Sequence, residues 1–204
     1  MAGVLEALRQ ATASRHEQLD GGLPLAHAHA GLPEYAHHLQ LLRDWMAPMN
    51  AWLATFDDGP QGPAGLPAVD RMALLEADLL EPGMVQRAPL PVERWPGHAS
   101  AAYRWGVLYV VEGAQLGGAV LYQRLHDALA PHPLRYLRGD PAGPGPRWRA
   151  CMLALKEHVT TPEEIADACA GACAAFDRIL ALHEALRGAS DDGHFHAINL
   201  EHTK

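Results

Sequence analysis

The chain has 204 residues, of which 49% are hydrophobic, and its 24 acidic and 16 basic residues give a formal net charge of −8. This length suits one domain with a single core, and an acidic chain without a run of Lys or Arg is a poor partner for nucleic acid or an anionic membrane. No apolar run approaches the 18 or so residues that cross a bilayer. The N-terminus has no signal-peptide layout, and Cys151, Cys169 and Cys173 do not form a disulfide framework, so we expect a cytoplasmic protein.

Alanine and leucine outnumber valine, isoleucine and threonine, which favours an all-α fold. Apolar spacing and turn signals predict a single-domain bundle of about six to eight helices. Six of these helices are placed at residues 4–20, 33–56, 68–80, 98–128, 146–159 and 161–186. Runs rich in proline and glycine separate them and predict loops. We expect one helical domain over residues 1–187 and a polar, flexible C-terminal tail over residues 188–204.

The helix expected near residues 98–128 contains Gly106, Gly113, Gly117 and Gly118. Each interior glycine costs a helix about 1 kcal/mol relative to alanine, so something must require the missing side chains. At about 100° per residue, three of the four fall on one narrow stripe, and the Gly117–Gly118 pair predicts a kink. Two interpretations remain open, a close crossing of two helices and a flat ligand lying against the glycines.

A partner for the glycine stripe is predicted in the first helix. His16 lies on the same face as Arg9, seven residues earlier, and apolar residues flank that face. A helix with one inward histidine, set against a bare glycine face, makes a slot for a planar macrocycle whose iron binds the histidine Nε2. Arg9 projects about 10 Å along the same helix and is placed to bind an acidic group at the macrocycle edge.

The segments LRQATASRHEQLD (8–20) and YVVEGAQLGG (109–118) resemble the proximal-helix and distal-helix motifs of heme oxygenases. They are most similar to the bacterial biliverdin-forming enzymes associated with bacteriophytochromes. The resemblance implies an all-α fold that holds heme b, iron protoporphyrin IX, between the first helix and the kinked glycine helix. It implies His16 as the iron ligand and Arg9 as a contact to a heme propionate. Further expected site residues are the distal-wall glycines Gly113, Gly117 and Gly118. Gln115 and Tyr109 are candidates to hold the distal water, with Tyr109 at the pocket rim. Arg147 and Arg149 are candidates to bind the propionates.

The resemblance also implies the reaction, in which heme, dioxygen and electrons give biliverdin, carbon monoxide and ferrous iron. Expected partners are an electron donor such as ferredoxin or a reductase, and a bacteriophytochrome that receives biliverdin. One position departs from the family pattern, because Ala114 stands where many members carry an acid that orders the distal water. Two alternatives therefore remain: a heme-binding protein without turnover, used for storage, transfer or sensing, and another enzyme of the same helical fold.

Overall fold

A computed structural model describes residues 3–27, 29–63, 65–91, 94–95 and 100–198, and its side chains at Ala26 and from residue 188 onward are not described. Within these residues the protein has seven α-helices, two short 3₁₀ helices and no strand. The α-helices are α1 (Val4–Gly22), α2 (Leu32–Leu53), α3 (Arg71–Leu79), α4 (Ala101–Leu125), α5 (Arg135–Arg138), α6 (Gly145–His158) and α7 (Pro162–Ile198). The 3₁₀ helices are η1 (Pro24–Ala26) and η2 (Gly59–Gln61). The all-α prediction is confirmed.

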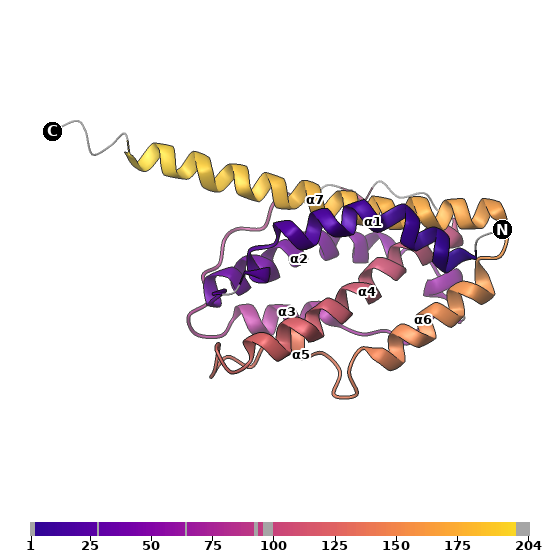
Figure 1. Cartoon of the computed structure of the whole chain (residues 1–204), viewed down its shortest axis with the longest axis horizontal. Coiled ribbons are helices and arrows are strands. Elements are labelled where there is room, and N and C mark those ends of the chain that lie inside the picture. The colour runs from indigo at the N-terminus through magenta and orange to yellow at the C-terminus, as the bar shows by residue number, and fades with distance from the viewer. Residues whose placement is uncertain (1–2, 28, 64, 92–93, 96–99, 199–204) are drawn as a thin grey trace.

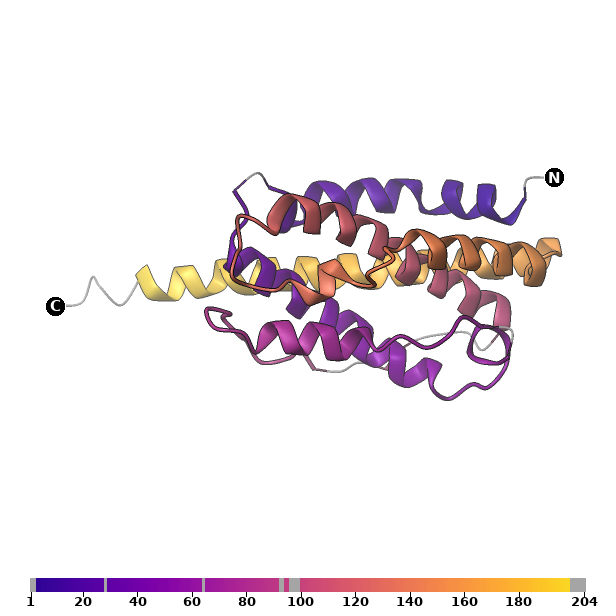
Figure 2. The same cartoon turned by 90° about the horizontal axis from the view of Figure 1, so that it is seen from below.

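Helix α7 is the longest element, and α1, α2 and α4 all pack on it (Figures 1 and 2). The crossing of α4 and α7 is very close, because a Cβ atom at Gly106 would lie 1.8 Å from the Ala168 carbonyl oxygen. A Cβ atom at Gly171 of α7 would likewise lie 2.0 Å from the Tyr103 carbonyl oxygen of α4. Only glycine allows two backbones to approach so closely, so these two glycines fix where the helices cross.

One face of α1 is buried in the first half of the helix and becomes open in the second. Val4, Leu8 and Thr12, spaced by four residues, are buried. His16 is the next residue in this series and its side chain is 64% exposed. Beside it, Arg15 donates two hydrogen bonds of 2.6 and 3.1 Å to the Asp177 carboxylate of α7. Helix α1 therefore stays attached to α7 while presenting His16 on its open side.

Helix α2 is anchored to the rest of the bundle at two points. Trp45 donates an indole hydrogen bond of 2.9 Å to the Ala175 carbonyl of α7. Tyr35 donates a 2.7 Å hydrogen bond to the carboxylate of Asp78, a fully buried residue of α3 that also accepts from the Tyr136 amide of α5. Because a buried carboxylate needs several donors, Asp78 holds α2, α3 and α5 together.

The predicted helix starts agree with the structure better than the predicted helix ends do. The start of α7 agrees with the predicted one, and Thr161 caps the helix, because its hydroxyl accepts from the Glu164 amide while the Glu164 carboxylate accepts from the Thr160 and Thr161 amides. The predicted ends at residues 20 and 186 were too early, since α1 continues through Gly21–Gly22 and α7 continues to Ile198 (Figure 1).

The four-residue α5 was not predicted. Of the region predicted to be a flexible tail, residues 188–198 have helical backbone, and residues 199–204 lie outside the described part. The kink predicted at Gly117–Gly118 stays a prediction; α4 is one continuous helix. None of the helices within the described residues is long and apolar enough to cross a membrane.

Candidate functional site: a slot between α1 and α4

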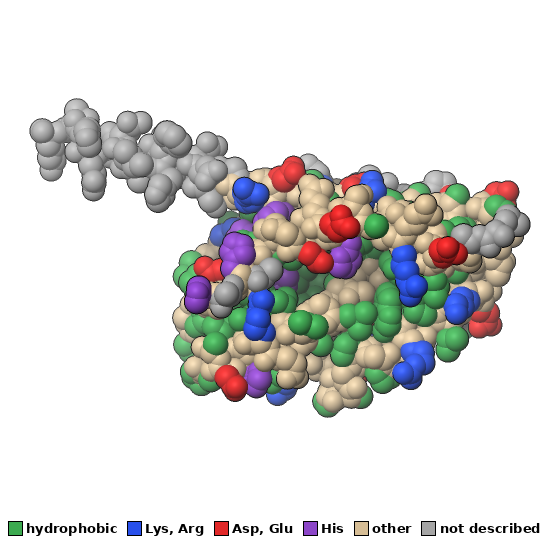
Figure 3. All heavy atoms as spheres, in the orientation of Figure 1, with side chains coloured by type: hydrophobic (Ala, Val, Ile, Leu, Met, Phe, Trp, Pro, Cys, Tyr) green, Lys and Arg blue, Asp and Glu red, His purple; other side chains and the backbone are tan. Residues whose placement is uncertain are grey.

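Helices α1 and α4 run in the same general direction, and each packs on α7 (Figures 1 and 2). The space-filling view shows this face hollowed below α1, with hydrophobic side chains along the hollow and basic side chains toward the N-terminal end (Figure 3). Phe176 of α7 lies in contact with His16, with ring centroids 5.9 Å apart. The slot therefore has α1 and α4 as its walls and α7 as its floor.

One electrostatic effect and one hydrogen bond indicate the relative position of the walls. Near one end, Arg9 on α1 is close enough to α4 for its charge to oppose the rise that burial causes in the pKa of the Tyr109 phenol. At the other end, Arg124 of α4 donates a hydrogen bond to the Leu25 carbonyl in η1, just after α1. Counting seven residues, about 10 Å, along each helix from Arg9 and Tyr109 puts His16 at about the level of Leu116, next to Gly117.

The His16 imidazole is already oriented by its neighbour on α1. Its Nδ1 atom lies 2.9 Å from Asp20 Oδ2, one helical turn further on. A carboxylate at Nδ1 favours the tautomer with the proton on Nδ1, which leaves the lone pair of Nε2 available. Nε2 has no hydrogen-bond partner in the described part of the chain. The arrangement fits a metal ligand that binds through Nε2.

The glycine stripe of α4 has different surroundings at its two ends. Gly106 packs against the Ala168 backbone of α7, as the close-crossing interpretation requires. At Gly113 a Cβ atom would lie 3.6 Å from the indole of Trp148 on α6, an ordinary packing distance. At Gly117 an added Cβ atom would meet no atom of the described residues within 4 Å beyond the adjacent helix backbone, and the residue is exposed. The stripe is thus buried where α4 crosses α7 and open where the two helices diverge.

Three other predicted residues lie at or next to the slot. Gly118 faces Leu137, whose Cδ2 atom would be 3.8 Å from an added Cβ, so it forms the side of the open stripe. Arg9 is exposed and makes no hydrogen bond or ion pair with the described residues. Tyr109 is half-buried, and burial raises the pKa of its phenol while the Arg9 charge opposes that rise. Tyr109 therefore remains a neutral hydroxyl that can donate or accept at the rim.

Arg147 and Gln115 are not brought to the slot. Arg147 donates to the Glu112 carboxylate at 2.9 Å and to a carbonyl of the loop before α3 at 2.7 Å. Gln115 lies about 200° around α4 from Gly117 and donates a 3.2 Å hydrogen bond to the Tyr136 hydroxyl. Both line a pocket on the opposite side of α4. Arg149 is exposed on α6, one residue beyond Trp148, and no partner is found for it within the described residues.

Sequence reasoning overlooked Asp20, Trp148 and Phe176 as residues of the site. Asp20 was available in the sequence, since an acid four residues after a histidine lies beside it on a helix. Trp148 and Phe176 reach the slot only because of how α6 and α7 dock, for which the sequence carries no local signal.

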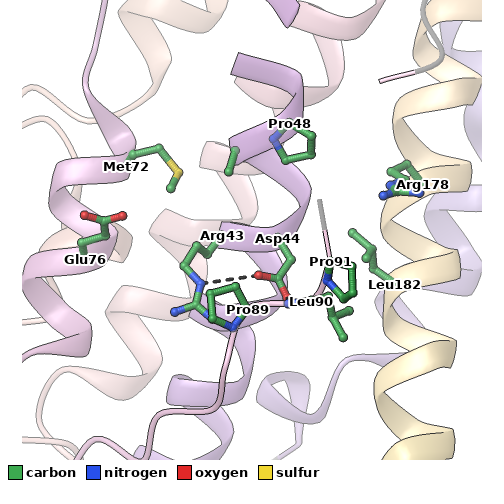
Figure 4. A pocket seen from close by; sticks show the side chains of 11 residues that line it. Arg43, Asp44, Pro48, Met72, Glu76, Pro89, Leu90, Pro91, Arg178 and Leu182 are labelled. Atoms are coloured by element: carbon green, nitrogen blue, oxygen red, sulfur yellow. Dashed lines mark hydrogen bonds and ion pairs between the residues drawn. The ribbon is translucent and has the colours of Figure 1, made fainter. Parts of the chain in front are cut away.

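A further pocket lies between α2, α3, α7 and the connector before α4, and does not belong to the slot (Figure 4). Its buried carboxylate, Asp44, accepts a 2.6 Å hydrogen bond from Arg87 and a 3.3 Å hydrogen bond from the Leu90 amide. Gln40 makes two hydrogen bonds to the same connector. Its side-chain Nε2 donates to the Val85 carbonyl, and its side-chain Oε1 accepts from the backbone amide of Arg87. These polar groups fasten the connector to α2 and so have a structural role.

Comparisons with known proteins show the family of the chain. No model of a protein family matches the sequence. A heme oxygenase from Xanthomonas campestris pv. campestris (strain 8004) is 34% identical over 162 residues, which span 74% of this chain and 90% of the relative. The fold is similar to the NO- and CO-bound heme oxygenase from Neisseria meningitidis, with a TM-score of 0.64, 24% identity, and coverage of 92% of this chain and 94% of the other. The curated relative matches over nearly its whole length, and the chain belongs to the heme oxygenase family.

Proposed function

We propose that this heme oxygenase seats heme b between α1 and α4 and cleaves it, with dioxygen and electrons, to biliverdin, carbon monoxide and ferrous iron. The observation that carries the proposal is His16, whose Nε2 is unpaired at about the level of the open part of the glycine stripe. A histidine on one wall and bare backbone on the other suit a flat ligand that is bound through its metal on one face only.

The residues of the slot fit heme in shape and in charge. Gly117 leaves the backbone of α4 accessible, and the floor at Phe176 is apolar. Arg9 has no partner and lies near the Tyr109 end of the slot, where it would form a charge-assisted bond to a propionate. Arg149 is a second propionate candidate, because it is exposed on α6 beside Trp148. Arg147 is not proposed, since its guanidinium is bound to Glu112.

Bound heme would supply both the iron that activates oxygen and the macrocycle that is cleaved. Asp20 accepts the Nδ1 proton of His16 in a hydrogen bond, which keeps the ring oriented. The bond also makes the Nε2 lone pair a stronger ligand for iron. Gly117 and Gly118 present backbone, with no acidic or basic side chain, to the distal side. Ala114 is exposed beside them and carries no acid, so protons on this side must come from water ordered by the backbone and by rim groups such as the Tyr109 hydroxyl.

The remaining assignments follow from the resemblance of the two motifs. We propose a protein of the type associated with bacteriophytochromes, which passes biliverdin to such a photoreceptor. Electrons would come from a ferredoxin or a reductase. The three cysteines are unpaired, which supports a reducing, cytoplasmic location.

Adding hemin to the purified protein tests the proposal. Hemin bound to the protein should give a sharper Soret band, shifted from that of free hemin, and ascorbate with oxygen and catalase should then convert that band to the absorption of biliverdin. Catalase removes free peroxide, so biliverdin formed in its presence is not a product of attack by free peroxide. A Soret band identical to that of free hemin would refute heme binding in the slot.

A heme-binding protein without turnover is the second candidate, and Ala114 is the observation that favours it. The same assay separates the two functions. A Soret band that persists under reductant and oxygen, with no biliverdin, would identify a binder. Turnover that appears only in Ala114→Asp would show in addition that the missing carboxylate is the reason.

A further inference from the structure

The open part of the glycine stripe has a wall at one end. The Trp148 ring carbons would lie 3.6 and 3.7 Å from a Cβ atom at Gly113, so the indole covers this glycine. The same indole contacts the Tyr109 ring, with centroids 5.4 Å apart and a tilt of 45° between the planes. One turn further along α4, a Cβ atom added at Gly117 would meet open space, with no neighbour within 4 Å among the residues that the structure describes. The covering of the stripe therefore stops between Gly113 and Gly117.

Trp148 is held in place by its own helix. The preceding residue, Arg147, donates to Glu112 of α4 at 2.9 Å, and Glu112 is 2% exposed. Three and seven residues further along α6, Cys151 and Leu155 are fully buried. An indole between such fixed points loses little additional freedom when a ligand packs against it. It can act as a rigid stop.

The four meso positions of heme differ only in the substituents around them, so the choice of the cleaved carbon depends on how the macrocycle is turned in its plane. A rigid aromatic wall at one end of the slot limits both the sliding and the turning of a planar ligand. We propose that Trp148, supported by Tyr109, sets the in-plane position of heme and thereby determines which meso carbon is cleaved. This inference rests on the proposed function and adds a specificity-determining residue to it.

The alternative is that Trp148 only packs α6 against α4. Two variants separate these roles. Trp148→Ala removes the aromatic wall. Trp148→Phe keeps an aromatic side chain at this position but replaces the indole with a smaller ring. Leu153→Ala is the matched control, because Leu153 lies on the same helix and is 61% exposed, away from the packed face.

Two measurements report the position of heme. Proton NMR of the ferric cyanide complex gives the heme-methyl shifts, which depend on in-plane orientation and need no turnover. Chromatography of the biliverdin esters gives the isomer ratio. We expect one dominant isomer and one set of methyl shifts for wild type and Leu153→Ala. For Trp148→Ala we expect a second set of shifts and at least a tenth of the product as another isomer, with Trp148→Phe in between.

The inference is overturned if Trp148→Ala binds heme with unchanged methyl shifts and an unchanged isomer ratio. It is also overturned if wild type already yields a mixture of isomers, because the wall would then select nothing. If Trp148→Ala does not fold, the shifts of Trp148→Phe decide between the roles. Failure of wild type to bind hemin would refute the proposed function itself, which is a separate result.

Discussion

The pair formed by His16 and Asp20 is the most informative contact between single residues in the site. The two side chains are one turn apart on α1, and both are largely exposed, at 64% and 67%. An exposed ion pair adds little to folding stability, so under the proposed function its effect would be on the iron ligand. A carboxylate on the non-ligating nitrogen orients a metal-bound histidine and raises its basicity.

Asp20→Asn is expected to weaken the bond from His16 to iron. Loss of the carboxylate should lower the iron–histidine stretching frequency of the ferrous complex in resonance Raman spectra, and heme affinity should fall by roughly tenfold. Glu17→Gln, a change of the neighbouring exposed acid on α1, serves as the control and should leave both unchanged. An unaltered frequency in Asp20→Asn would show that the pair does not act on the ligand.

Gln115→Leu should have a small effect on turnover, even though Gln115 lies beside the distal glycines in sequence. Its side chain is on the far face of α4 and binds the Tyr136 hydroxyl. We expect the rate of biliverdin formation to change by less than about tenfold, or 1.4 kcal/mol of barrier. A loss of a hundredfold or more, with heme still bound, would place Gln115 in the distal water network.

At the scale of an element, α4 shows how one stripe of glycines can have two roles. Helices α4 and α7 cross at Gly106 and then diverge, so the same face is buried at first and open later. The open part is where the close approach of a ligand to the backbone is possible. The close-crossing interpretation is therefore confirmed at Gly106, and the ligand interpretation stays a prediction for the open part of the helix.

Gly106→Ala and Gly117→Ala should change stability in opposite directions. At Gly117 the methyl group meets open space, so helix propensity should raise the unfolding free energy of the apoprotein by up to about 1 kcal/mol. At Gly106 it would meet the Ala168 carbonyl at 1.8 Å, and the backbones must separate, which should cost about 2 kcal/mol or more. Urea unfolding of the two variants measures both effects, and equal changes would contradict the assignment of separate roles.

Helix starts were predictable because their signals are local. Thr161 and Pro162 begin α7 as expected, since the cap and the first turn use neighbouring residues only. The ends were less predictable. A glycine pair such as Gly21–Gly22 commonly ends a helix, yet α1 includes both residues. The four residues of α5 are too few to show a periodic pattern.

At the scale of the whole molecule, buried histidines should make the fold sensitive to acid. His38 is 8% exposed, and burial lowers its pKa to about 4. Burial, the nearby His183 and Arg87 also lower the pKa of His37, with Glu34 opposing them. A histidine whose pKa is lower in the folded state than in the unfolded state contributes stability above about pH 6.5, and this contribution is lost as the pH falls toward the folded pKa.

The unfolding free energy of the apoprotein should therefore fall between pH 6.5 and pH 5, by at most about 1.4 kcal/mol per pH unit for each histidine. Paired carboxylates protonate mainly below this range, so the window isolates the histidines. His38→Gln retains a polar side chain that does not titrate, and its stability should depend less steeply on pH. If the slopes of wild type and His38→Gln are equal in urea unfolding, His38 is not responsible.

Much of the site could be predicted from sequence because its main parts lie in two short helical segments. His16, Arg9 and the glycine stripe are each readable from helical spacing. The errors concern long-range pairing. Arg147 is held by Glu112, to which Arg71 of α3 also donates, and spacing within α6 does not reveal such a partner. The wall at Trp148 likewise depends on how α6 docks against α4.

The proposed bond between His16 and the iron of a heme seated between α1 and α4 can be tested by a hemin titration of His16→Ala, with wild type as the reference and with and without added imidazole. The variant should still take up heme loosely, with a shifted Soret band and no biliverdin formation. Imidazole, bound in the space left by the side chain, should restore the wild-type spectrum and part of the turnover. A variant with an unchanged Soret band and full activity would contradict the assignment.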